Sequence, residues 1–184
     1  MVLLGSKAPG RLTEQHDTFF GIAENLQSLV PAMKEFWPES ANSLHIDAWT
    51  NIKYVQPFTI HAVARSTPKA IEEKREKLFF INLGGYKKGE FEEYHYKCLI
   101  VAADKSGAIQ KSKETAFYRH TGFDGASSHV DDKYGVDVDD IYDIEDILPD
   151  QMKELYRLQI LATDNRELLL EDELNIGYLK LNKI

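Results

Sequence analysis

The sequence has a single cysteine, Cys98, so no disulfide can form within the chain. It has no apolar run approaching the ~20 residues that cross a bilayer, and residues 1–11 lack the basic start and long apolar stretch of a secretion signal. These absences exclude a disulfide scaffold and argue against a membrane protein. We therefore expect the protein to be cytoplasmic.

Positive charge is also scarce, because 22 Lys and Arg residues stand against 30 Asp and Glu residues, which gives a formal net charge of −8. Such a charge repels a phosphate backbone, so nucleic acid is not expected as a partner. The hydrophobic fraction of 43% and the charged fraction of 28% are those of an ordinary globular protein. A length of 184 residues fits one compact domain or two small ones.

The two halves of the sequence carry the same pattern. A shift of 79 positions (83 minus 4) places residues 4–35 over residues 83–114 without a gap. In both halves, two glycines five residues apart are followed by Glu-x-His, and this recurrence predicts an internal duplication. The corresponding residues are Gly5, Gly10, Glu14 and His16 in the first half and Gly84, Gly89, Glu93 and His95 in the second.

A second signature follows in each half. Residues 44–47 (LHID) correspond to residues 128–131 (SHVD) once five extra residues (84 minus 79) are allowed in the second copy. The insertion falls beside glycines, where a longer loop costs little.

Apolar periodicity predicts strands and one clear amphipathic helix, at about residues 25–37. The expected strands are residues 1–4, 18–23, 58–63, 78–83, 97–103 and 156–162, with an edge strand at 179–184. We predict an α+β fold of two pseudo-symmetric repeats, each a strand-loop-strand-helix-strand unit with mainly antiparallel sheet. The first unit would span 1–65, a charged polar linker 66–77, and the second unit 78–184, packed as one domain or as two halves.

Carboxylates and imidazoles share strand faces in this pattern. Residues i and i+2 of a strand point to the same side, which pairs Glu14 with His16 and Glu93 with His95. The same spacing pairs the His and Asp of each His-x-Asp segment if that segment is extended. The candidate ligand or metal sites are therefore Glu93, His95, His129 and Asp131 in the second repeat, and Glu14, His16, His45 and Asp47 in the first.

Two imidazoles and two carboxylates can hold Zn²⁺, Mn²⁺ or Fe²⁺, so a divalent metal is the cofactor to test. The same atoms can instead form a structural network, in which each carboxylate accepts a hydrogen bond from a ring N–H. Acid/base catalysis is a third interpretation. The sequence leaves the three open.

The glycine loops carry no phosphate-binding motif. Gly84, Gly85 and Gly89 have the spacing of a phosphate loop, but Glu90 stands where that motif requires lysine. These glycines, like Gly5 and Gly10, indicate turns that need positive φ or close backbone approach.

Two further signals are interpreted as structural. Cys98 lies three residues after His95, on the opposite face of the expected strand, so we expect it in the core and not as a nucleophile. The acidic stretch 131–150 lacks the glycine and glutamate of a calcium loop. Its alternation over 136–139 is typical of a strand with one solvated face.

The second half resembles a known family. Residues 83–90 (LGGYKKGE), Glu93, His95 and residues 129–132 (HVDD) are similar to a small bacterial family, domain of unknown function 1543, over most of 78–145. Its members carry one or two copies of the module, which agrees with the duplication, and the first copy departs more from the pattern. The resemblance implies an architecture and no activity.

These observations favour a non-enzymatic module that binds a small ligand or another protein. The alternative is a metal-dependent or acid/base enzyme that uses the repeated Glu, His, His and Asp set. A homodimer through edge strands is compatible with an open sheet.

Overall fold

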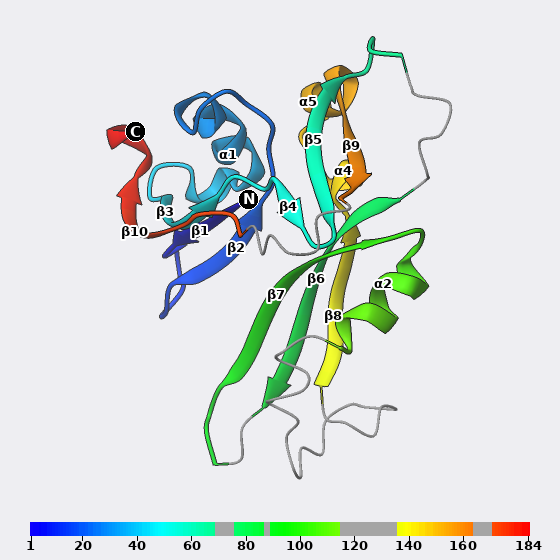
Figure 1. Cartoon of the computed structure of the whole chain (residues 1–184). Helices are drawn as coiled ribbons and strands as arrows, with labels where there is room; N and C mark the ends of the chain where they lie inside the picture. The colour runs from blue at the N-terminus through cyan, green and yellow to red at the C-terminus, as the bar shows by residue number, and fades with distance from the viewer. Residues whose placement is uncertain (69–75, 87–88, 115–135, 164–170) are drawn as a thin grey trace. The chain divides into compact units, whose positions relative to one another are not determined.

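A computed structural model describes residues 1–68, 76–86, 89–114, 136–163 and 171–184 (Figure 1). The elements of the first part are β1 (Val2–Ser6), β2 (Gln15–Phe19), η1 (Gln27–Leu29), α1 (Val30–Phe36), η2 (Pro38–Ser40), β3 (His45–Thr50), β4 (Tyr54–Val55) and β5 (Phe58–Ala64). Those that follow are β6 (Lys77–Tyr86), β7 (Glu93–Ala102), α2 (Lys105–Ser112), β8 (Val136–Asp143), α4 (Ile144–Ile147), α5 (Asp150–Leu155), β9 (Tyr156–Ala162), β10 (Leu174–Lys180) and η3 (Leu181–Lys183).

The chain divides into two compact units. One unit combines Met1–Lys69 with Ile147–Ile184, and the other is Ala70–Asp146. This differs from the predicted division, which assigned all of 78–184 to the second unit. The reason is long-range pairing: β10 pairs with β3, and β9 pairs with β5 along its whole length. The predicted linker 66–77 falls mostly outside the described residues.

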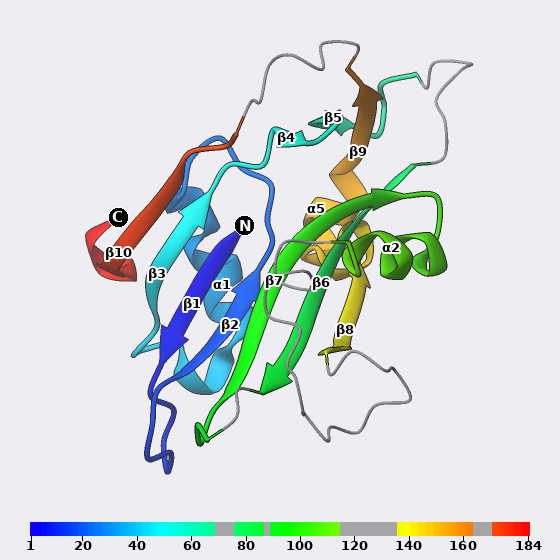
Figure 2. The same cartoon turned by 60° about the horizontal axis from the view of Figure 1, so that its bottom comes forward.

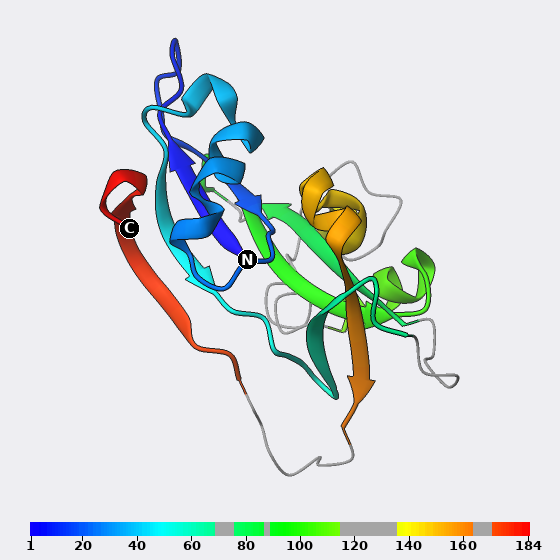
Figure 3. The same cartoon turned by 90° about the horizontal axis from the view of Figure 1, so that it is seen from above.

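The first unit is built on a four-stranded antiparallel sheet in the order β10-β3-β1-β2. Helix α1 lies on one face of this sheet (Figure 3). There Met33 of the helix and Leu4 and Ile46 of the strands are fully buried. A second sheet of this unit has the order β4-β5-β9.

Helix α1 lies within the predicted range but is shorter than predicted. Pro31 lies in the first turn, where its missing N–H costs nothing. The Asn25 side chain accepts a hydrogen bond from the Ser28 N–H at 2.9 Å, so the chain enters the helix through the short turn η1. The regular helix is therefore Val30–Phe36 instead of 25–37.

Two predicted strands are displaced. The strand expected at 18–23 is β2, which ends at Phe19 because the turn after β1 sets its register, with Ser6 opposite Gln15. The edge strand expected at 179–184 is β10, and the chain after Lys180 forms a 3-10 turn. The remaining predicted strands overlap β1, β5, β6, β7 and β9, although β6 and β7 extend several residues beyond their predicted bounds toward the turn that joins them.

The second unit is a three-stranded antiparallel sheet in the order β7-β6-β8, with α2 on one face (Figure 2). Phe79, Ile81 and Leu83, at alternate positions of β6, pack with Ala108 of the helix and form the core of this unit. Asp104 caps α2 by accepting the Gly107 N–H at 2.8 Å.

The fold is thus mixed α+β with mainly antiparallel sheet, as predicted. No described helix is long and apolar enough to span a membrane.

The C-terminal segment contributes to the core of the first unit, which can be tested with two matched leucines. Leu181 is 6% exposed and belongs to that core, whereas Leu174 on β10 is 60% exposed. Leu181→Ala is expected to lower the free energy of unfolding by about 2–4 kcal/mol in urea titrations. Leu174→Ala should change it by less than about 0.5 kcal/mol. Equal effects would contradict the packing described.

Candidate functional site

Two glycine turns lead into the candidate residues. Gly10, between β1 and β2, has φ of 79°, and Gly89, between β6 and β7, has φ of 84°. Only glycine adopts this backbone conformation freely, which confirms the predicted need for positive φ. Each turn is followed by a Glu-x-His segment that runs back along the sheet, and this places the histidine opposite a residue near the end of the preceding strand.

That histidine lies opposite a glycine in both units. His16 pairs with Gly5 across β2 and β1, and His95 pairs with Gly84 across β7 and β6. On the other side of the central strand, Gly5 faces His45. The missing glycine side chain leaves space on the sheet surface, and polar side chains of β3 in the first unit and of β8 in the second occupy that space.

A β-bulge aims one aspartate into each space. In the β1–β3 pair, Leu3 faces Ala48 and Leu4 faces Ile46, so Asp47 is the extra residue. The β6–β8 pair shifts register between Asn82 and Leu83, and there the extra residue is Asp139. A bulge redirects the side chain of its extra residue, which explains why these two carboxylates reach the glycines.

A side chain at either glycine would force the neighbouring polar side chains to move. A Cβ placed on Gly5 would lie 2.3 Å from Asp47 Oδ2 and 2.5 Å from His45 Nε2. One placed on Gly84 would lie 2.1 Å from Asp139 Oδ2. The expectation of close approach at these two glycines is therefore confirmed.

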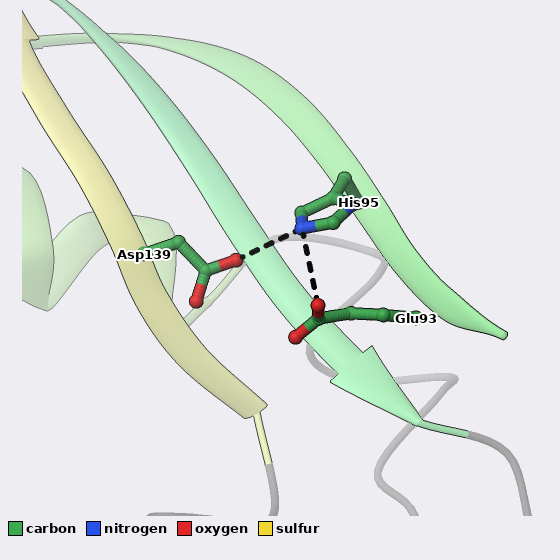
Figure 4. A group of neighbouring side chains, drawn as sticks. All are labelled: Glu93, His95 and Asp139. Atoms are coloured by element: carbon green, nitrogen blue, oxygen red, sulfur yellow. Dashed lines mark ion pairs between the residues drawn. The ribbon is translucent and has the colours of Figure 1, made fainter. Parts of the chain in front are cut away.

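The second-unit cluster consists of Glu93, His95 and Asp139 (Figure 4). His95 Nε2 lies 3.3 Å from Asp139 Oδ2 and 3.9 Å from Glu93 Oε2. One ligand atom from each residue lies within 4.8 Å of the others. The side chains are 30–42% exposed, so water and ions reach them.

The first-unit cluster consists of Glu14, His16, His45 and Asp47, arranged as a chain of contacts. His16 Nε2 lies 3.1 Å from Asp47 Oδ2. His45 Nε2 lies 3.4 Å from Asp47 Oδ1 and 2.8 Å from Glu14 Oε1. Glu14 and His16 are open to solvent, whereas the His45 side chain is only 5% exposed.

Two buried atoms of this cluster lack hydrogen bonds. His45 Nε2 and Asp47 Oδ2 are within ion-pair distance of their neighbours, yet neither has a hydrogen-bond partner among the described residues. An unsatisfied buried polar atom costs about 1–3 kcal/mol of stability, so a proton or a cation that binds these two atoms would stabilise the cluster.

The structure describes all of the predicted site residues of the first repeat but only some of those of the second. Pairwise contacts link the four first-repeat residues in a chain, and in the second repeat Glu93 and His95 share a face as expected. His129 and Asp131 lie outside the described residues. The residue opposite Gly84 on β8 is Asp137, not a residue of the 129–131 segment. The carboxylate that completes the described second cluster comes from Asp139.

Asp139 was not among the residues predicted from the sequence. The alternation over 136–139 correctly predicted a strand, and its aspartates were interpreted as solvated. Nothing local distinguishes a solvated aspartate from one that a bulge directs over a glycine. A search for an i, i+2 pair of acidic residues opposite a strand glycine would have found it.

Neither cluster lines the cavity of about 200 Å³ found in the first unit. That cavity is lined by Ala8, Arg11, Gln15, Trp37 and Glu39. What the clusters can do chemically is therefore set by their own donors, which can coordinate a cation or exchange a proton.

Comparison with known proteins supports the fold and part of the family resemblance. The family model of Domain of Unknown Function (DUF1543) matches residues 11–63, in the first half rather than over 78–145. The crystal structure of a protein Il1583 from Idiomarina loihiensis is similar, with a TM-score of 0.63, 20% identity, and coverage of 98% of this chain and 94% of that chain. No curated protein matches the sequence. The likeness shows the fold, so function has to be argued from the site.

Cys98 is partly buried at the edge of the core, close to the predicted core position. It packs against the buried cluster of the second unit, and burial raises the pKa of its thiol to about 11. A thiol with this pKa is almost entirely protonated near neutral pH, which removes the nucleophilic thiolate.

The reactivity of Cys98 gives a direct test. At pH 8 we expect iodoacetamide to alkylate the native protein about a hundredfold more slowly than the urea-unfolded protein, since the pKa lies about two units higher in the fold. The native rate should rise about tenfold per pH unit up to pH 11. Mass spectrometry of the single cysteine measures both rates, and equal rates at pH 8 would contradict the burial.

Proposed function

We propose that this protein is a non-enzymatic binding module that holds a divalent transition-metal ion through Glu93, His95 and Asp139. The observation that carries the proposal is the convergence of one imidazole nitrogen and two carboxylate oxygens within 4.8 Å of one another over Gly84. These donors come from two different strands, so the sheet itself brings them together.

The distances suit coordination. Two ligand atoms at about 2.0–2.1 Å from a tetrahedral metal ion are about 3.3 Å apart. His95 Nε2 and Asp139 Oδ2 are separated by 3.3 Å, and Glu93 Oε2 is 3.9 Å from the same nitrogen. A short side-chain rotation of Glu93, which is exposed, would close the set.

The charges also favour a cation. Two carboxylates beside one imidazole repel each other unless a positive charge lies between them. With two carboxylates and one nitrogen, the set is oxygen-rich and suits Mn²⁺ as well as Zn²⁺. Three protein donors leave further positions of the ion open to water or to a small ligand.

We also infer that the two clusters descend from one duplicated unit. The support is that equivalent parts recur with the shift of 79: Gly5 with His16 and Gly84 with His95 face each other, and Gly10 and Gly89 both have positive φ. The bulges likewise fall at equivalent points of β1 and β6.

Metal binding can be measured with Mn²⁺ after treatment with a chelator. Electron paramagnetic resonance of free Mn²⁺ is expected to report a site that weakens at least about tenfold in His95→Asn and in Glu93→Gln, since each variant loses one donor. Matched controls are His61→Asn and Glu92→Gln, which change an exposed histidine and an exposed glutamate outside the cluster. Retained affinity in the cluster variants, or equal loss in the controls, would refute the proposal.

Gly84→Ala tests the same site without removing a donor. The new methyl group would occupy the space where Asp139 Oδ2 now lies, so the carboxylate must move and Mn²⁺ affinity should fall about tenfold. Gly107→Ala is the control, because a Cβ at that position would lie 3.5 Å from its nearest neighbour, Asp104 Oδ1, and alanine favours the helix there. If both variants bind Mn²⁺ like the parent, the position of Asp139 over the glycine has no role in binding.

A further inference from the structure

We propose that the first-unit cluster is a second cation site, of a different chemical class: a zinc-type site formed by Glu14, His16, His45 and Asp47. It uses no residue of the second-unit cluster. Either site can therefore exist without the other.

The ring of His45 has one nitrogen beside a backbone carbonyl oxygen and the other beside two carboxylates. The ring is nearly fully buried, and Nδ1 lies 3.4 Å from the Ser43 carbonyl oxygen. A carbonyl oxygen can only accept, so this contact places a proton on Nδ1, and in the neutral ring it makes Nε2 the nitrogen that can bind a metal ion. Histidine ligands in metal sites are held in this way, with the other ring nitrogen donating to a backbone carbonyl.

Two carboxylates face Nε2 of the His45 ring. Nε2 lies 2.8 Å from Glu14 Oε1 and 3.4 Å from Asp47 Oδ1, both of which are acceptors. Acceptors this close repel unless a proton or a metal ion lies between them. Nε2 and Asp47 Oδ2 also have no hydrogen-bond partner among the described residues, so both atoms are open to a proton or a metal ion.

Rigidity favours a defined site. Gly5 lets the His45 ring lie directly against the central strand, and the Tyr178 ring stacks on it with 4.4 Å between ring centroids. The aspartate is fixed by its bulge. Two of the four donors are thus held by the fold, whereas the exposed Glu14 and His16 can rotate to admit an ion.

Donor chemistry sets the class of metal. Two imidazoles and two carboxylates make a neutral site with a divalent ion, which suits a half-buried position. Imidazole nitrogens favour Zn²⁺ and Co²⁺ over Mn²⁺ and Mg²⁺. The second-unit cluster has one described imidazole and is more exposed, so the two sites should differ in selectivity.

The experiment titrates Zn²⁺ into chelator-treated protein by calorimetry, with three variants. In Glu93→Gln/His95→Asn, the zinc site of the first unit should remain, with one equivalent bound. In Glu14→Gln/His16→Asn, affinity of that site should fall at least about a hundredfold, since two donors are lost. Asp17→Asn/His61→Asn is the control, with an exposed carboxylate and an exposed imidazole outside the cluster.

Two readouts keep the result interpretable. Thermal melting of the metal-free variants shows whether each is folded, and both changed side chains of the first-unit variant are solvent-exposed. Co²⁺ should give visible d–d absorption without a thiolate charge-transfer band, because no cysteine is a ligand. That absorption should disappear in Glu14→Gln/His16→Asn.

The outcomes separate the two sites. Zinc binding lost only in the Glu93→Gln/His95→Asn variant would overturn the first-unit site and leave the proposed function intact. Loss of stability in metal-free Glu14→Gln/His16→Asn, with no zinc bound by the parent protein, would mean that a proton on His45 Nε2 completes a structural network, and would also overturn it.

Discussion

A bulged aspartate lying over a strand glycine is the arrangement on which the rest of both clusters depends. The glycine removes one side chain from the sheet surface, and the bulge turns the aspartate of the neighbouring strand into that space. Asp47 over Gly5 and Asp139 over Gly84 show the same solution. Without the glycine the carboxylate has no room, and without the bulge it points elsewhere.

The two faces of each central strand, β1 and β6, differ in character: one carries core residues and the other faces the polar cluster. One face of β1 buries Val2 and Leu4 against the helix, and one face of β6 buries Ile81 and Leu83. The next residues along, Gly5 and Gly84, belong to the opposite faces, where the polar groups gather. A hydrophobic core on one side thus fixes the register that positions the cluster on the other.

The two clusters use this frame differently. In the first unit the nearly buried ring of His45 lies against two carboxylates, whereas the second unit has three exposed donors. The same backbone arrangement can therefore hold different donor sets, because the strands supply positions and the side chains supply the chemistry.

The sequence by itself determined the local features. Glycine spacing predicted turns with positive φ, strand alternation put Glu93 and His95 on one face, and apolar periodicity located most strands. These follow from neighbouring residues, whose geometry is fixed by the backbone.

Only the tertiary structure decided which distant residues meet. The pairing of β10 with β3, the bulge at Asp139 and the burial of His45 each depend on contacts between segments far apart in the chain. Strand register is chosen by the packing of a whole face, and no local pattern records where an extra residue is inserted. For that reason the sequence indicated the donors near each glycine turn but not the aspartate of the second cluster.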